Sequence, residues 1–330
     1  MAYIYKKMIG GREYYYLRAS VQRGKKLLTK DLAYLGSDLD QVREALRKIP
    51  PATIRKTYKT IQRYLESNTF LEQARALKMK ASPYVDRTLL EQVEACRLHW
   101  QKVTKKRDEK TQEDYLKMFV VDFTFNTTSI EGNTITLREA ARLLTEHVTP
   151  KNKTLREIHD IQNTEKIFLE ITKGSLVLTH ESIIDLHKRL MDNIDWRIGY
   201  RTADVHVVNA QFSSTPAVYV RADMDVLLRW YAKHQDMHPL ILAGITHHKF
   251  EKIHPFFDGN GRAGRMLMNT ILLDKGYPPL IVRKKRRAEY LDALGKADKA
   301  ALTQASPESY KPLMEFLASE IIDGYWSMFL

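Results

Sequence analysis

The sequence contains a single cysteine, Cys96, among 330 residues, so no disulfide bond can form within the chain. An unpaired thiol is typical of proteins that stay in a reducing compartment. No apolar run approaches the length that crosses a membrane, and the first seven residues, Met-Ala-Tyr-Ile-Tyr-Lys-Lys, lack the apolar stretch of a signal peptide. These absences argue against a secreted disulfide scaffold and a membrane-spanning protein, and they predict a cytoplasmic location.

Acidic residues are scarce in the first quarter of the chain. Residues 1–80 hold 18 Lys and Arg but only 7 Asp and Glu, a net charge of +11, whereas the whole chain carries +13. The basic character therefore belongs to the N-terminal segment, and such an asymmetry bears on binding partners rather than on fold. The same segment interleaves its cations with tyrosines, namely Tyr3, Tyr5, Tyr14, Tyr15, Tyr16, Tyr34, Tyr58 and Tyr64.

Two interpretations of this basic segment stay open. A basic sheet with aromatic rings would bind nucleic acid by neutralising phosphate charge and by stacking on bases. Alternatively, residues 1–82 form a small solvated domain that docks on the rest of the chain or recruits an acidic partner. The lack of a recognised nucleic-acid motif favours the second interpretation.

Strand and turn patterns predict a small sheet at the start of the chain. Residues 2–36 divide into three strands separated by glycine-containing turns, which predicts a β-meander. Ser37, with Asp40 three residues later, predicts a capping box for a short helix. A second, basic helix is expected over residues 53–79.

Ser82-Pro83 is the predicted domain boundary, which gives a basic N-terminal domain over residues 1–82 and a second domain over residues 83–330. Apolar spacing predicts that the second domain is almost entirely helical. Its helices are expected near 89–100, 112–133, 154–172, 180–193, 221–235, 240–253, 264–275, 286–296 and 309–328. The exception is the segment 203–220, where β-branched residues around a polar turn predict a β-hairpin, so the fold class is mainly α.

The segment from His254 to Arg265, His-Pro-Phe-Phe-Asp-Gly-Asn-Gly-Arg-Ala-Gly-Arg, combines a base, an acid, a glycine-rich turn and two cations. The Gly-Asn-Gly turn can direct successive backbone N–H groups at one anion, and the helix expected after it would favour the same anion at its N-terminus. Arg262 and Arg265 are three residues apart, so both can project from one helix face. Asp258 offers a hard oxygen ligand for Mg²⁺, and His254 can accept a proton near neutral pH. These are the parts of a site that transfers a group from a nucleotide phosphate.

All nine specified positions of this segment match the signature of the Fic family, His-Pro-Phe-x-Asp/Glu-Gly-Asn-Gly-Arg-x-x-Arg, so the chain resembles that family. The resemblance covers roughly residues 85–330. It implies a helical bundle with a β-hairpin, called the flap, over the active site. It also implies protein adenylylation, in which AMP moves from ATP to a Ser, Thr or Tyr hydroxyl of a target protein and pyrophosphate leaves.

The resemblance assigns a role to each motif position. His254 would be the general base that deprotonates the target hydroxyl, and Asp258 would hold Mg²⁺, with Mn²⁺ as the alternative ion. The turn would cradle the α-phosphate, and the two arginines would bind the β- and γ-phosphates. The nucleotide-binding positions would be Gly259, Asn260, Gly261, Arg262 and Arg265.

A second segment, Thr127-Thr-Ser-Ile-Glu131-Gly-Asn133, resembles the inhibitory motif of the family, Ser/Thr-x-x-x-Glu-Gly/Asn. The resemblance implies that Glu131, on a helix over about 112–133, pairs with Arg265 and keeps the γ-phosphate out. A carboxylate and a phosphate compete for the same cationic fork, which gives this inhibition a physical basis. The alternative is a solvated glutamate at a helix end. We therefore expect an enzyme that is inhibited by its own helix.

Further expectations rest on the resemblance. The flap, at about 203–220, would dock a target protein segment as an added strand. Arg201 matches an arginine that often precedes the flap, and Tyr290 stands where relatives place an adenine-contacting tyrosine. For these two residues a packing role and a ligand role stay equally open. A homodimer is a further expectation, because relatives often use one to control the inhibitory helix.

Other functions compete with adenylyl transfer. In some relatives the inhibitory glutamate orients a water molecule and the enzyme removes AMP, and other relatives transfer phosphocholine, phosphate or UMP. A different class of function is a nucleic-acid-binding regulator whose second domain senses nucleotide without turnover. The complete motif favours ATP as donor, and an intact His254 argues against a pure sensor.

Overall fold

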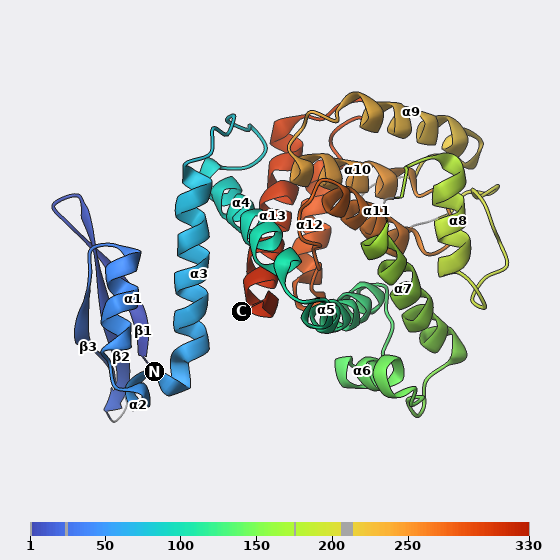
Figure 1. Cartoon of the computed structure of the whole chain (residues 1–330). Helices are drawn as coiled ribbons and strands as arrows, with labels where there is room; N and C mark the ends of the chain where they lie inside the picture. The colour runs from blue at the N-terminus through green and yellow to red at the C-terminus, as the bar shows by residue number, and fades with distance from the viewer. Residues whose placement is uncertain (1, 24–25, 175, 206–213, 330) are drawn as a thin grey trace.

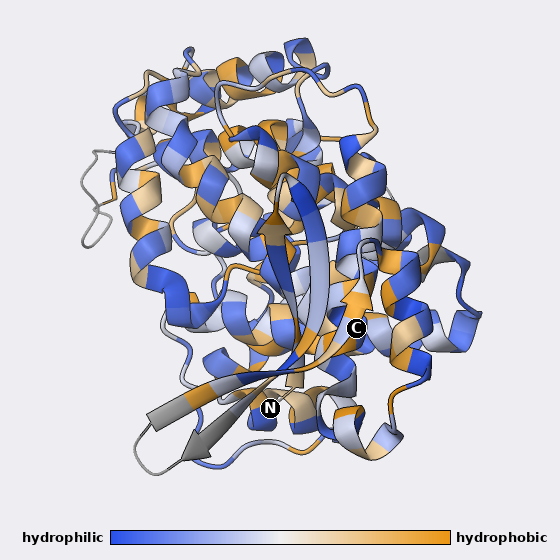
Figure 2. Cartoon of the chain, turned by 90° about the vertical axis from the view of Figure 1, so that its left-hand side faces the viewer, coloured by the Kyte–Doolittle hydropathy of each residue, from blue (hydrophilic) through white to orange (hydrophobic). Residues whose placement is uncertain are grey.

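The computed structural model describes residues 2–23, 26–174, 176–205 and 214–329 (Figure 1). The chain begins with an antiparallel sheet of order β1-β2-β3, formed by β1 (Ala2–Ile9), β2 (Arg12–Arg23) and β3 (Lys26–Gly36). Gly10 and Gly11 join the first two strands with positive φ at both positions, which the tight turns of hairpins require. The predicted β-meander is confirmed. In Figure 2 this sheet lies in front of the helical body.

Three helices follow the sheet: α1 (Leu39–Arg47), α2 (Pro51–Ile54) and α3 (Tyr58–Arg75). The expected capping box at Ser37 is wrong, because Asp38 is the N-cap and its side chain accepts from the backbone N–H of Gln41. The helix expected over 53–79 is broken near its start by a short 3-10 turn, Arg55–Thr57. Apolar residues of the sheet, α1 and α3 form one cluster: Ala2, Ile4, Tyr15, Leu17, Leu35, Leu39, Val42, Leu46, Ile61 and Leu65.

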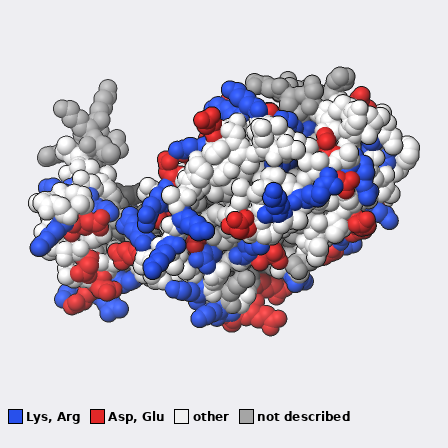
Figure 3. All heavy atoms as spheres, turned by 90° about the horizontal axis from the view of Figure 1, so that it is seen from above, with Lys and Arg blue, Asp and Glu red and all other residues white. Residues whose placement is uncertain are grey.

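Helix α3 joins this N-terminal unit to the helical body (Figure 1). Its early residues belong to the cluster under the sheet, whereas Phe70 and Ala74 pack with Leu98 of α4 (Arg87–Lys102) and Tyr325 of α13 (Pro307–Phe329). The packing therefore changes from one unit to the other within α3, and the boundary at residues 82–83 stays a prediction. On the face in Figure 3, Lys and Arg side chains gather where the two parts meet.

The body consists of helices, as the apolar spacing predicted. Between α4 and α13 the chain forms α5 (Glu109–Ile130), α6 (Leu137–Glu146), α7 (Leu155–Lys173), α8 (His180–Leu190), α9 (Val220–Lys233), α10 (Pro239–Ile253), α11 (Asn260–Asp274) and α12 (Arg287–Ala297). Helix α6 has no counterpart among the expected helices. Helix α11 begins four residues earlier than expected, because the glycine-rich turn itself forms its first turn.

Helices α10 and α11 form the centre of the body, with α7, α8, α9, α12 and α13 around them (Figure 1). Nearly all residues of both helices are buried, including polar side chains such as His247, Lys249 and Asn269. Two large apolar clusters meet at this pair of helices. The loop between α10 and α11 is therefore held from both ends by the best-packed elements of the fold.

The hairpin expected over 203–220 falls largely on residues 206–213, which lie outside the described residues. At its C-terminal end the expectation is wrong, since Ala217–Tyr219 form a 3-10 turn and Val220 begins α9. Within the described ranges, no helix is long and apolar enough to span a membrane.

Candidate active site

His254 ends helix α10 in a left-handed conformation, with φ 53° and ψ 60°, and its N–H donates to the carbonyl of Phe250 at 3.0 Å. Such a conformation is uncommon outside glycine and needs support from its surroundings. Arg201 supplies that support. Its Nε donates to the His254 carbonyl at 2.8 Å, and its backbone N–H donates to the Pro255 carbonyl at 2.9 Å.

The Arg201 side chain is fully buried, and it also donates to the carbonyls of Ala203 and Thr215. One guanidinium thus joins the loop after α10 to both ends of the segment 203–215. The structure therefore places Arg201 behind the motif loop, where it fixes backbone rather than facing a ligand. This settles the two roles left open for Arg201 in favour of packing.

The His254 ring is suited to act as a base. Its Nδ1 lies 3.3 Å from the Glu251 carbonyl, which can only accept, so the neutral ring carries its hydrogen on Nδ1 and leaves Nε2 as an acceptor. Burial lowers the pKa of His254 below its ordinary value, and the charge of Arg201 acts in the same direction. The imidazole therefore remains unprotonated at neutral pH.

The glycine-rich turn is braced by Asn260. Its side-chain oxygen accepts from the Phe256 N–H at 2.9 Å, and its side-chain nitrogen donates to the Phe256 carbonyl at 2.9 Å. The Phe256 ring is buried and stacks on His187, with ring centroids 3.6 Å apart. Gly259 adopts φ 77° at the N-cap of α11. The turn is therefore rigid, and the Asn260 side chain, expected at an α-phosphate, is committed to the loop.

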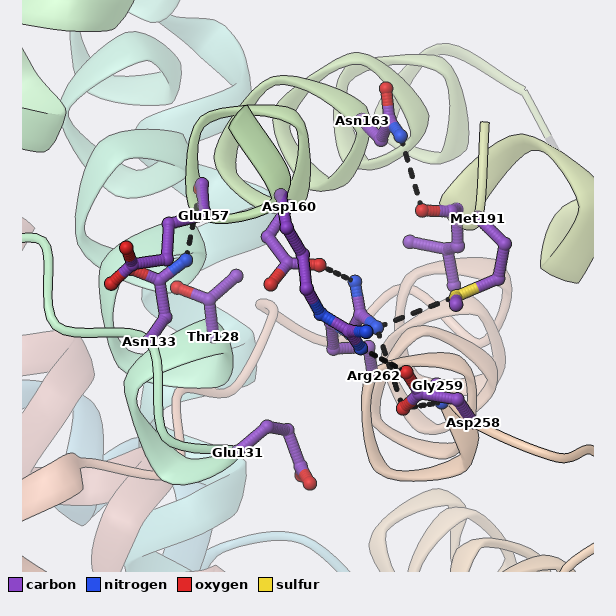
Figure 4. Close-up of polar contacts among 12 residues, drawn as sticks. Thr128, Glu131, Asn133, Glu157, Asp160, Asn163, Met191, Asp258, Gly259 and Arg262 are labelled. Carbon is purple, nitrogen blue, oxygen red and sulfur yellow. Dashed lines mark hydrogen bonds and ion pairs between the residues drawn. The ribbon is translucent and has the colours of Figure 1, made fainter. Parts of the chain in front are cut away.

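Asp258 lies among cations at the edge of this turn (Figure 4). Its carboxylate pairs with Arg156 of α7 and accepts from the Gly259 N–H at 2.6 Å, and Arg262 Nη2 lies 3.9 Å away. Burial favours the neutral acid, but the charges of Arg262 and Arg156 outweigh it and hold the pKa of Asp258 below its ordinary value. The carboxylate is therefore ionised.

Arg262 is held from the opposite side by α7 and by Met191, which directly follows α8. Its buried guanidinium pairs with Asp160 and lies 3.4 Å from the sulfur of Met191. Figure 4 shows Asp160, Arg262 and Asp258 in succession across the site. Sequence reasoning missed both Arg156 and Asp160. No local pattern singles them out, because α7 meets the motif only through the fold.

Asp258 is the residue that could hold a divalent cation. The described part of the chain contains no cluster of three or more His, Cys, Asp or Glu side chains able to enclose a metal. A single ionised carboxylate suits Mg²⁺, which is commonly bound by one or two carboxylates together with substrate phosphates and water. Arg156 would have to give up its contact with Asp258 for the ion to bind.

Glu131 reaches Arg265 across the start of α11. The Arg265 Nη2 donates to Glu131 Oε1 at 2.7 Å and to the Thr127 carbonyl at 3.0 Å, and its Nε donates to Thr127 Oγ1 at 2.7 Å. The Arg265 side chain is 3% exposed and that of Glu131 is 42% exposed. Burial lowers the pKa of Arg265, but the negative charge of Glu131 raises it. The resulting pKa of Arg265 lies above its ordinary value.

The Glu131 carboxylate also covers the first turn of α11. A Cβ atom added to Gly261 would overlap it, so the carboxylate lies directly against the helix start. That position is the one at which backbone donors and the helix dipole favour an anion. The contact expected between Glu131 and Arg265 is therefore present, and the Glu131 carboxylate lies at the start of α11.

The end of α5 is fixed, so the position of Glu131 is defined. Arg287 Nε donates to the Ile130 carbonyl at 2.9 Å, and the Asn133 side chain donates to the Glu157 carbonyl at 2.9 Å (Figure 4). Gly132 follows with φ 103°, which ends the helix.

Tyr290 does not face the site. It is 1% exposed, and its hydroxyl lies 2.5 Å from His247 Nε2 behind Arg265. This burial favours the packing role of Tyr290 over the ligand role, because the ring is almost wholly enclosed. Glu251 lies in the same pocket, 3.8 Å from His247 Nδ1, and burial raises its pKa to about 8.

Comparison with known proteins agrees with this geometry. Residues 177–272, which run from just before α8 into α11 and include the motif loop, match the model of the Fic/DOC family. The chain contains a Fic/DOC domain. It is 32% identical over 206 residues to a protein named "Protein adenylyltransferase Fic" from Drosophila ananassae, an alignment that covers 59% of this chain and 38% of the relative. The chain thus spans about two fifths of the length of that curated relative.

Solved structures show the same fold. A Fic domain containing signaling protein from Bacteroides thetaiotaomicron superposes with a TM-score of 0.65 at 25% identity, covering 71% of this chain and 94% of the other. A Fic-1 structure from C. elegans superposes with a TM-score of 0.62 at 19% identity, covering 88% of this chain and 86% of the other. At that identity the second likeness concerns fold alone. The expected mainly helical Fic fold is confirmed.

Proposed function

We propose that the protein is a protein adenylyltransferase that Glu131 keeps inhibited. The observation that carries the proposal is the hydrogen bond between Glu131 and Arg265 at the start of α11. A carboxylate held there supports an anion site at the turn and its arginine, and it would block the anion that the reaction needs. The name of the Drosophila relatives supports the same activity.

The residues of the loop would carry the transfer step. The Nε2 atom of His254 would take the proton from a target hydroxyl, whose oxygen then forms a bond to the α-phosphorus of ATP. The bond from that phosphorus to the bridging oxygen breaks, and pyrophosphate leaves. Backbone N–H groups of the turn would hold the α-phosphate, and Arg262 and Arg265 would stabilise charge on the leaving pyrophosphate, since such transfers depend on positioning and fixed charge.

A divalent cation would complete the site. Asp258 would hold Mg²⁺, or Mn²⁺ as the alternative, and the bound ion would neutralise phosphate charge. The contact with Arg156 would break when the ion binds, and it keeps the carboxylate ionised until then.

The inhibition would work by exclusion. The Arg265 guanidinium already donates hydrogen bonds to Thr127 and Glu131. A phosphate at the same place would be repelled by the Glu131 carboxylate and would find these donors already bonded. With Glu131 displaced, the phosphate would gain both the arginine and the helix start.

Partners and location stay proposals. The target segment would dock near residues 203–220, over the side of the loop that Arg201 secures. A homodimer and a cytoplasmic location complete the proposal, with the inhibitory helix as the part that an assembly would control.

The test uses Glu131→Gly, incubated with cell lysate, Mg²⁺ and one labelled donor at a time. Label from ATP marked at the α-phosphate is expected on protein, and label from ATP marked at the γ-phosphate is not. A double variant with His254→Ala should transfer nothing. Transfer of the γ-label, or of UMP in place of AMP, would assign another donor to the same fold.

Removal of AMP is the alternative activity at this site. Glu131 is 42% exposed, so one of its oxygens could meet water. Labelled lysate, freed of the Glu131→Gly variant and then incubated with wild type, distinguishes the two. Loss of label that needs both Glu131 and His254 would assign removal of AMP as the activity of the wild type.

A further inference from the structure

The N-terminal sheet has two different faces. Ala2, Ile4, Tyr15 and Leu17 point inward and are buried against α1 and α3. Because side chains alternate along a strand, the residues between them point outward, away from the helical body. In Figure 2 the sheet is the element nearest the viewer, and no helix covers it.

The outward face gathers five tyrosines. The strand register places Tyr5 opposite Tyr16, and Tyr16 opposite Tyr34, so three rings form a row across all three strands. The ring centroids of Tyr16 and Tyr34 are 5.4 Å apart, and those of Tyr14 and Tyr34 are 6.4 Å apart. Tyr3 extends the same face along β1. Tyr34 is 54% exposed, so its ring is open to solvent.

Cations border these rings. Lys7 pairs across the strands with Tyr14, and Arg12 lies opposite Ile9 on the same face, and both cations are exposed. The guanidinium of Arg18 lies 3.6 Å from the centre of the Tyr5 ring and pairs with Asp31. Among the outward positions of known placement, Asp31 is the one carboxylate, and Arg18 already neutralises it. The face is therefore positive as well as aromatic.

We propose that this outward face of the sheet, defined by Tyr3, Tyr5, Tyr14, Tyr16, Tyr34, Lys7, Arg12 and Arg18, binds single-stranded nucleic acid. Unpaired bases offer flat surfaces that stack on tyrosine rings, while cations between the rings neutralise the phosphates. A duplex hides its bases, and an acidic protein would use the cations but not a row of rings in which Tyr34 is exposed and Tyr5 and Tyr16 are partly exposed. The net charge of +11 over residues 1–80 supplies long-range attraction for a polyanion.

This inference does not depend on adenylyl transfer. The sheet is carried on α3 away from the loop between α10 and α11 (Figure 1), so a bound strand would occupy a separate site. Loss of transfer activity would leave the binding prediction unchanged, and the reverse also holds.

The test measures fluorescence anisotropy of a fluorescein-labelled mixed-pyrimidine oligonucleotide of about 12 nucleotides, a length within the usual span of such sites, with the full chain. Wild type should bind at low salt and more weakly as salt rises. Tyr34→Leu combined with Tyr16→Leu should weaken binding at least about tenfold, since each stacked base contributes on the order of 1–3 kcal/mol. Lys7→Gln should lower the salt slope by about 0.7, the value for one phosphate contact to a single strand.

Matched variants separate the face from the fold. Tyr16→Phe with Tyr34→Phe keeps the rings and should retain binding. Tyr58→Ala removes a tyrosine that is 57% exposed in the same basic segment but off the sheet, and it should also bind as wild type does. Circular dichroism with thermal melting checks that the leucine variant is folded.

Four results would overturn the proposal: no salt-sensitive binding, equal affinity for a duplex of the same sequence, equal loss from Tyr58→Ala, or full binding by the folded leucine variant. If the folded leucine variant binds fully while Lys7→Gln weakens binding, the cations act without the rings. That result would assign the face to an acidic protein.

Discussion

Replacement of Glu131 by Gln should strengthen ATP binding. The change keeps the size of the side chain but removes the charge that occupies Arg265 Nη2 at 2.7 Å. A hydrogen bond to a charged group contributes about 1.5–3 kcal/mol net. Glu131 is partly exposed, so solvent screens part of this energy, and we take the lower half of the range. The expected gain is about 10- to 40-fold in the dissociation constant for ATP.

Isothermal titration calorimetry with Mg²⁺ and ATP measures this gain directly. Glu146→Gln is the matched control, because Glu146 is an exposed glutamate on α6 that pairs with Arg142 at 3.1 Å. The control should bind ATP as wild type does. An unchanged dissociation constant for Glu131→Gln would refute the reasoning.

A second variant tests whether the effect passes through Arg265. With Arg265→Ala in the background, Glu131→Gln should change ATP affinity by less than about threefold. The arginine that pairs with Glu131 is then absent, so removal of the Glu131 charge has no pair to break. A full gain in that background would show that Glu131 acts by another route, such as general repulsion at the start of α11.

Three further predictions follow from the buried groups around the loop. In the Glu131→Gly background, transfer should stay constant as pH falls from about 7.5 to 6.5, because burial lowers the pKa of His254 and keeps its base form present; a decline centred above pH 6.5 would contradict this. Arg201→Ala should lower the free energy of unfolding by about 2–4 kcal/mol, measured by urea denaturation, because it leaves buried carbonyls without a donor. A loss below about 1 kcal/mol would refute the role of Arg201 in fixing the backbone of the loop. Glu251→Gln should raise the free energy of unfolding more at pH 8 than at pH 5, by at least about 2 kcal/mol. The reason is that, between the ordinary pKa of Glu and about 8, Glu251 is protonated in the folded state but ionised in the unfolded state. Equal effects at both pH values in denaturant melts would exclude a neutral buried Glu251.

The parts of the site that are contiguous in sequence were predictable. His254, Asp258, Arg262 and Arg265 lie within twelve residues, and a turn followed by a helix fixes their mutual placement locally. The partner of Arg265 was predictable for a different reason, because Glu131 carries a short pattern of its own. The two residues of that pair are 134 positions apart, so their pairing followed from the resemblance and not from local backbone geometry.

The residues that complete the site were not predictable, because tertiary packing places them. Arg156 and Asp160 lie one turn apart on α7 and meet the loop across about a hundred residues of chain. The sequence could not choose between a packing role and a ligand role for Tyr290, since a position in sequence does not show that a ring is enclosed. Arg201 was found by position, but its role depended on carbonyls from three separate segments.

The fold was predictable where the pattern was strong. Alternation gave the β-meander, and apolar spacing gave the central helices within a few residues. Helix α6 escaped notice because it is short and buries only Ala140 and Leu143 on its inner face. The N-cap of α1 was assigned one residue early, because Ser37 and Asp38 are both good caps and only the backbone angles distinguish them.

The most direct test of the account is the ratio of AMP incorporation between Glu131→Gly and wild type, measured in lysate with α-labelled ATP and with His254→Ala placed in both backgrounds. The account predicts strong incorporation by Glu131→Gly, little by wild type and none by either protein that carries His254→Ala. Equal incorporation by wild type and Glu131→Gly would contradict the inhibition, and incorporation that survives His254→Ala would contradict the chemistry assigned to the loop.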